Sequence, residues 1–180
     1  MLPYHLGRGQ MERIKIFLRI IDFIIKWTGK MVSFLVIVII GVTIWEVVLR
    51  YVFNAPTIWA FDAAYLIFGA YGLLGGAYTL YFKGHVSVDI LYGRLSLKTR
   101  AIIDLLTFPF FLLFCSLLLW KGGEMAWDSL KIMERGSSAW NPPIYPIKLT
   151  IPLGAFLLLI QGVAKFIRDL MMAATGKEVA

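Results

Sequence analysis

Long apolar blocks separated by short polar connections make up most of this chain. Four blocks are long enough to cross a bilayer, whose core needs about 20 mostly apolar residues in a helix. They run over residues 31–49, 58–82, 101–120 and 145–164. Backbone groups in lipid must be satisfied within the segment, so each block is predicted to be helical, with a bend at Pro109 and another at Pro152. The pattern predicts an all-α integral membrane protein with four transmembrane helices.

The segment before the first block has a different pattern. Between residues 11 and 30, apolar side chains recur at helical spacing with charged side chains between them: Ile14, Phe17, Leu18, Ile21, Ile24 and Ile25. This pattern predicts an amphipathic basic N-terminal helix that lies on the inner leaflet or leads into the first span. The expected organisation is a basic segment over 1–30, a membrane domain over 31–170 and a tail over 171–180.

Composition and charge agree with a membrane location. The chain is 59% hydrophobic and 16% charged, whereas a soluble domain carries about 25% charged residues. The net charge of +7 does not indicate nucleic-acid binding, because the basic residues flank apolar blocks and form no patch with interleaved aromatics. Of the 18 Lys and Arg residues, 13 lie in the N-terminal segment, the second connection and the tail. The positive-inside rule therefore predicts that both termini are cytoplasmic.

Three charged residues lie near the outer ends of the first two spans. Glu46 and Arg50 are four residues apart and share a helix face. Asp62 lies in the opening turns of the second span, where the helix dipole favours a carboxylate. The cluster could contact an ion or solute, since charge inside a span is often functional. A structural network that pins two helices or holds a partner subunit is favoured, because the penalty for charge is small near the interface.

Small residues and one histidine are further candidates. Gly72 and Gly76 form a GxxxG pair, which lets helices pack closely in lipid, either within this chain or against another subunit. His85 and Asp89 follow the second span and suggest a proton relay or a metal pair. A metal site needs more ligands, so a structural role at the interface is favoured for His85. Bis-histidine haem is rejected because no span contains a histidine.

The third connection is the longest. A helix is predicted to continue to Arg135 and to end at Gly136 in a C-cap role, and residues 137–143 are predicted to run extended. Trp140 and Asn141 could dock a partner on the outer side. The alternative is a return turn anchored by an interfacial Trp.

No nucleophile–base pair, nucleotide loop or carboxylate pair in a soluble pocket occurs in the sequence, so no enzymatic activity and no cofactor are expected. The spans also lack the polar groups that would line a solute pathway, which opposes a complete carrier. Two alternatives remain. One is a membrane anchor of a quinone-linked redox enzyme, which the histidine count opposes, and the other is a standalone four-helix channel.

Several of these residues resemble a known family. The run from Ile44 to Pro56 (IWEVVLRYVFNAP), Trp59, Asp62, the Gly69–Gly76 segment and the run GHVSVD at residues 84–89 look like the small membrane subunit (DctQ type) of tripartite ATP-independent periplasmic (TRAP) transporters. Two positions depart from the family pattern: Asp62 stands where Glu is usual, and Lys83 near a position often held by Arg.

The resemblance implies a role in the cytoplasmic (inner) membrane of a bacterium or archaeon. A periplasmic binding protein would deliver a small solute, often an organic acid, to a large membrane subunit that couples transport to sodium. The small subunit would brace the large one and help to form the docking surface. The matching positions would be structural or subunit contacts: Glu46, Arg50, Trp59, Asp62, Gly72, Gly76, His85 and Asp89.

Overall fold

The computed structural model describes residues 8–82 and 97–175, and the described chain is almost entirely helical. The elements are α1 (Arg8–Tyr51), α2 (Ala60–Tyr81), α4 (Leu97–Lys131), the single turn α5 (Tyr145–Lys148) and α6 (Thr150–Thr175). Four of them, α1, α2, α4 and α6, are long and apolar enough to cross a membrane. The predicted fold class, an all-α membrane protein with four spanning helices, is confirmed.

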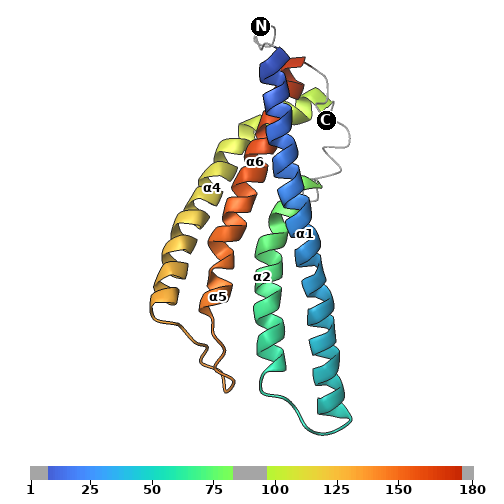
Figure 1. The fold of residues 1–180 in the computed structure, drawn as a ribbon, viewed down its shortest axis with the longest axis vertical. Coiled ribbons are helices and arrows are strands. Elements are labelled where there is room, and N and C mark those ends of the chain that lie inside the picture. The colour runs from blue at the N-terminus through green and yellow to red at the C-terminus, as the bar shows by residue number, and fades with distance from the viewer. Residues whose placement is uncertain (1–7, 83–96, 176–180) are drawn as a thin grey trace.

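The four long helices form a row and do not close into a square bundle (Figure 1). The main contacts join α1 to α2, α2 to α6, and α6 to α4. Helix α6 is therefore central, and 33% of its most apolar stretch is buried, against 6% for α4 at the edge. Among the described helices, the side chains on the outer faces of the row consequently have no neighbouring helix packed against them.

The predicted amphipathic segment is the beginning of α1 and is not a separate helix. It leads directly into the first span, which is one of the two arrangements that the sequence allowed. The apolar side of this segment is held by Leu18, Ile21 and Ile25, which are buried with Ala77 of α2 and Ala164 of α6. These contacts explain why the helix continues without interruption into the basic region.

The two predicted bends have different outcomes. Helix α4 continues through Pro109, and Figure 1 shows it changing direction over its first turns. Near Pro152 the helix is interrupted, because α5 ends at Lys148 and α6 begins at Thr150. Proline has no N–H, so Pro152 cannot donate the hydrogen bond to the carbonyl of Lys148 that would continue the helix.

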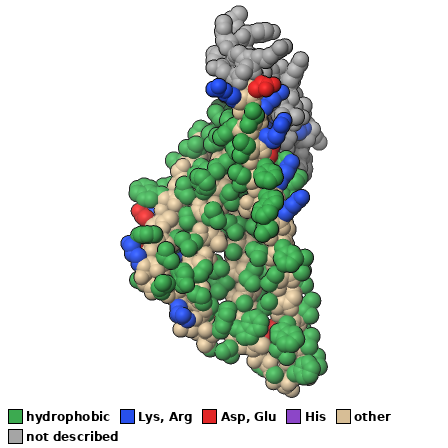
Figure 2. Space-filling view, in the orientation of Figure 1, with side chains coloured by type: hydrophobic (Ala, Val, Ile, Leu, Met, Phe, Trp, Pro, Cys, Tyr) green, Lys and Arg blue, Asp and Glu red, His purple; other side chains and the backbone are tan. Residues whose placement is uncertain are grey.

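The surface is mostly apolar. Figure 2 shows hydrophobic side chains over most of the visible face, with charged side chains gathered toward its ends and edges. Many large apolar residues are more than half exposed, among them Phe34 on α1, Phe68 on α2 and Phe110 on α4. A water-soluble monomer rarely exposes contiguous patches of this extent. Lipid or a partner subunit must therefore cover these faces.

Candidate functional site

The outer end of α1 carries a network centred on Glu46. Arg50 donates two hydrogen bonds to Oε1 of Glu46, from Nη2 at 2.6 Å and from Nε at 3.0 Å. Oε2 of Glu46 accepts two more from Thr57, one from its backbone N–H at 3.1 Å and one from its hydroxyl at 2.5 Å. Hydrogen bonds to an ionised carboxylate are stronger than neutral ones. The network therefore ties the end of α1 to the start of α2.

The chain reverses sharply between these two helices. Asn54 has a φ of 50°, and the N–H of Ala55 donates to the carbonyl of Leu49 at 3.0 Å. This hydrogen bond reaches back six residues and closes the end of α1, and Asn is one of the few residues that enters the left-handed region readily. Pro56 then prevents the helix from resuming. The turn places Thr57 against the Glu46 carboxylate.

Asp62 lies outside this network. It occupies the first turn of α2, as the sequence predicted, but it forms no hydrogen bond or ion pair with Glu46 or Arg50. The structure therefore brings two of the three predicted charges together and adds Thr57. Sequence reasoning missed Thr57, whose hydroxyl also accepts a hydrogen bond from the N–H of Ala60, the first residue of α2, at 3.3 Å.

Two tryptophans join the outer connections. The rings of Trp59 and Trp140 lie 6.4 Å apart at an interplanar angle of 54°. Trp59 precedes α2, whereas Trp140 belongs to the connection between α4 and α5. The contact therefore links the two helical hairpins at their outer ends. Trp140 remains 38% exposed, so part of its ring is available to a partner.

The outer loop around Trp140 is folded back on itself. The N–H of Gly136 donates to the carbonyl of Pro142 at 2.8 Å, and the N–H of Asn141 donates to the carbonyl of Ser138 at 3.0 Å. Asn141 has a φ of 51°. The prediction that residues 137–143 run extended is therefore wrong, because these hydrogen bonds close a narrow loop with Trp140 and Asn141 at its turn.

The end of α4 also differs from the prediction. The helix ends at Lys131, and the residue in the left-handed region is Met133, with a φ of 49°. The N–H of Glu134 donates to the carbonyl of Ser129 at 3.0 Å, which completes a Schellman end. The prediction of a C-cap at Gly136 is wrong by three residues, since the helix ends without a glycine.

An ion pair holds the base of this loop. Nζ of Lys148 lies 2.5 Å from Oε2 of Glu134, and both side chains are mostly covered. The Lys148 ammonium holds the pKa of the Glu134 carboxyl below its ordinary value of 4.5. The carboxylate therefore stays ionised at neutral pH, and the pair fastens the start of the α5–α6 segment to the end of α4.

The two glycines of the predicted GxxxG pair, Gly72 and Gly76, have different surroundings. A Cβ at Gly76 would be in ordinary contact with Leu158 of α6, whereas one at Gly72 would have nothing within 4 Å. The closest backbone approach is at Gly154, where a Cβ would lie 2.6 Å from the carbonyl oxygen of Leu73. Three more glycines adjoin side chains of a neighbouring helix: Gly29, Gly122 and Gly162. Sequence reasoning missed these four because they form no GxxxG pair.

His85 and Asp89 lie outside the described residues. Among the described residues, no group of three or more His, Cys, Asp and Glu side chains is placed to hold a metal ion.

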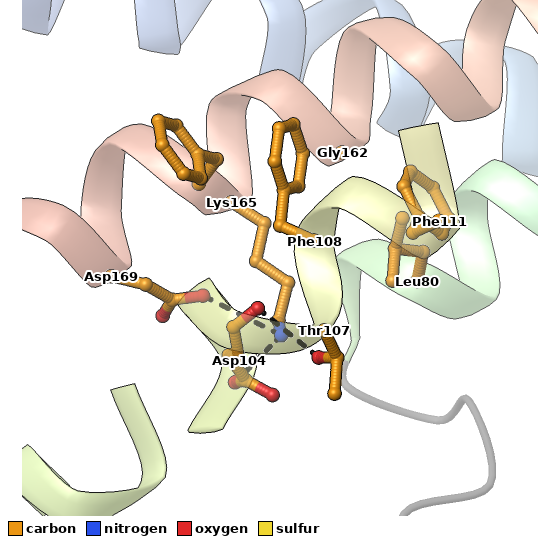
Figure 3. A pocket seen from close by; sticks show the side chains of 9 residues that line it. Leu80, Asp104, Thr107, Phe108, Phe111, Gly162, Lys165 and Asp169 are labelled. Atoms are coloured by element: carbon orange, nitrogen blue, oxygen red, sulfur yellow. Dashed lines mark hydrogen bonds and ion pairs between the residues drawn. The ribbon is translucent and has the colours of Figure 1, made fainter. Parts of the chain in front are cut away.

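A second cluster of charges lies between α4 and α6, at the opposite end of the helices. Nζ of Lys165 is 2.6 Å from Asp104 and 3.5 Å from Asp169, and all three side chains are mostly covered. Figure 3 shows the three converging beside a small pocket. Phe108, which lines the pocket, stacks on Phe166 with the ring centroids 4.3 Å apart. The cluster fastens α4 to α6, as lipid-embedded charges require partners.

Sequence reasoning did not single out Asp104 or Lys165 as members of a site. A signal was available, because Asp104 lies inside an apolar block and a lone carboxylate there is costly. One more ion pair joins α6 to the beginning of α1, with Nη2 of Arg168 lying 2.6 Å from Oδ1 of Asp22. Ion pairs thus join α6 to both α4 and α1 at this end of the helices, and the Glu134–Lys148 pair joins the end of α4 to α5 at the other end.

The row of four long apolar helices, fastened by ion pairs at both ends, defines a multi-pass helical membrane protein. A family model described as tripartite ATP-independent periplasmic transporters, DctQ component, matches residues 39–172. The chain belongs to this family, the small membrane component of TRAP transporters, and it is a transporter subunit and not an enzyme. The resemblance found in the sequence is confirmed. A search of curated proteins gave no match.

Proposed function

We propose that this chain braces the large membrane subunit of a TRAP transporter and helps to dock the periplasmic solute-binding protein. The observation that supports this role is the open row of helices. In the described part of the chain, the main packing joins only neighbours in the row, and the flanking helices α1 and α4 do not close around a shared interior. A solute path through this chain alone would need such an enclosure lined by polar groups.

The uncovered side of α2 is the surface that we assign to the large subunit. Phe61, Tyr65 and Phe68 are 77%, 72% and 61% exposed and follow one another at helical spacing. Gly72 continues the same face and has open space before it. Aromatic side chains around a glycine form a shaped surface on which another helix could pack closely. Arg50 at the outer end of α1 is half exposed beside Glu46 and is a second candidate contact.

Trp140 and Asn141 are the docking residues that we propose for the binding protein. They lie at the turn of the outer loop, and the Trp59 contact and the Glu134–Lys148 pair hold that loop in place. A rigid aromatic on a fixed loop loses little conformational entropy on binding.

The outer side would be periplasmic, with both termini cytoplasmic and the protein in the inner membrane. The proposed solute is a small organic acid. Cofactors are not expected in this chain, and sodium coupling would reside in the large subunit.

The test is co-purification. The tagged chain, co-expressed with the large subunit of its own system, should retain that subunit through affinity and size-exclusion steps. Gly72→Leu should reduce the retained amount at least tenfold, because it fills the space between the aromatics of the proposed contact. Gly123→Leu on α4 is the matched control, since a side chain there also meets nothing within 4 Å. Equal retention by both variants would contradict the assigned surface.

A further inference from the structure

The inner half of α1, defined here as residues 12–30, has one face that packs against other helices of the same chain. Leu18, Ile21 and Ile25 are buried against α2 and α6. Asp22 is paired with Arg168 at the edge of this face. The helix is therefore held in place by its own chain and needs no further partner on this side.

A second face of the inner half carries an apolar stripe, which consists of Ile16, Ile20, Phe23 and Trp27. These side chains follow one another at spacings of four, three and four residues, so they line one side of the helix. They are 54%, 54%, 67% and 60% exposed. The apolar stripe therefore faces away from the chain and requires an apolar environment from outside.

A third face carries a basic stripe, which consists of Lys15, Arg19, Lys26 and Lys30. All four side chains are exposed. Asp22 shares this side of the helix, but its carboxylate is already bound to Arg168 and does not neutralise the stripe. Figure 2 shows a line of Lys and Arg side chains down the upper edge of the molecule, beside hydrophobic ones.

The length of α1 places these stripes at the edge of the bilayer. The helix has 44 residues, which at 1.5 Å per residue is about 66 Å, roughly twice the thickness of the hydrocarbon core. Its stretch without charged residues runs from Met31 to Trp45 and accounts for most of one crossing. The inner half therefore begins where the hydrocarbon ends. If α1 ran perpendicular to the bilayer there, the exposed Ile16 and Ile20 would meet water, so α1 must run obliquely at this end to keep these residues near the lipid headgroups.

We propose that the inner half of α1 is a binding surface for anionic phospholipids. The apolar stripe would enter the acyl-chain boundary, and the basic stripe would contact the headgroup phosphates. Lipid fits better than a protein partner, because the cores of protein interfaces are depleted in Lys, whereas an apolar stripe with Trp beside a Lys- and Arg-rich one is typical of helices at a membrane surface. Each Lys or Arg side chain near an anionic membrane surface raises the affinity of the protein for that surface about fivefold.

Trp27 provides the readout. The full-length chain is placed in phosphatidylcholine vesicles that contain a minority of brominated phosphatidylglycerol or, in parallel, the same fraction of brominated phosphatidylcholine. The quenching of Trp27 is obtained by subtracting the fluorescence signal of the Trp27→Phe variant from that of the unaltered chain, with each brominated lipid in turn. We expect stronger quenching by the anionic lipid, and we expect the triple variant K15Q/R19Q/K30Q to lose at least tenfold in that preference. Lys26 is left unchanged because its ammonium lies over the Tyr81 ring.

The control is the outer triple variant K121Q/K131Q/R135Q, which removes the same charge from the other end of the molecule and should keep the preference. Equal quenching by the two lipids, or a preference that survives the inner triple substitution, would overturn the proposal. The measurement is repeated on the complex with the large subunit. If Trp27 is no longer quenched there by either lipid, protein covers the stripe and the lipid assignment is wrong.

Discussion

Gly154→Ala tests the packing of the membrane domain at its tightest point. A Cβ at this position would lie 2.6 Å from the carbonyl oxygen of Leu73 and 2.9 Å from its carbonyl carbon. Both atoms belong to the backbone of α2 and cannot rotate away. The two helices would have to separate by roughly 0.8 Å to restore van der Waals contact. Overpacking of this kind costs about 1–3 kcal/mol.

Part of that cost is offset, because Ala favours a helix over Gly by up to about 1 kcal/mol. Because both contacted atoms are backbone and cannot relax, the overpacking cost should lie in the upper part of that range. The expected net loss is therefore about 1–2 kcal/mol in the free energy of unfolding, or a fall of about 2–8 °C in the unfolding midpoint for a chain of this size. The assay is thermal unfolding of the purified chain in detergent, followed by intrinsic fluorescence. The shift should be reproducible across scan rates.

Gly72→Ala is the matched control on α2. It adds the same methyl group where nothing lies within 4 Å, so the isolated chain should be unchanged or slightly more stable. If Gly72→Ala destabilised the isolated chain as much as Gly154→Ala, the α2–α6 contact would not be where the structure places it. A Gly154→Ala chain with an unchanged midpoint would refute the reasoning as well.

Three further predictions concern the charged contacts. Arg50→Glu should cut co-purification with the large subunit several-fold, because it places a second negative charge beside the outer network; unchanged assembly would count against that network. Lys148 lowers the pKa of Glu134, so Glu134→Gln should lower the unfolding midpoint at pH 7. The difference in midpoint between the unaltered chain and the variant should vanish as the pH falls below 4.5 and through the lowered pKa. A difference that grows in acid would contradict the pairing. Lys165→Met removes this cation from Asp104, whose side chain is mostly covered, and should destabilise the chain by about 1–3 kcal/mol in denaturant titrations. No loss of stability would indicate that the cluster is solvated.

The four spanning helices could be predicted from the sequence because lipid imposes a simple rule on length and polarity. The point at which α1 begins could not be read from that rule. The basic residues of its inner half indicate a surface helix, and only the burial of Ile21 and Ile25 against α6 shows that the same helix continues into the membrane. Local periodicity marks these side chains as one apolar face, but it does not show whether lipid or a distant helix of the same chain covers that face.

The glycines show the same limit. The GxxxG spacing of Gly72 and Gly76 marks a face of α2, but whether a glycine admits another backbone depends on what stands opposite. Gly154 is isolated in the sequence, yet it lies against Leu73. Likewise Met133 ends α4 in a conformation that glycine would adopt more easily. The Glu134–Lys148 pair next to it holds the loop in that path.

Reconstituted uptake tests the account most directly. Proteoliposomes would contain the large subunit with this chain, the large subunit without it, or this chain alone, each supplied with the binding protein and its solute. The account predicts uptake only when both membrane subunits are present, and none from this chain alone. Solute flux through this chain by itself, or full uptake in its absence, would contradict the role of a bracing and docking subunit.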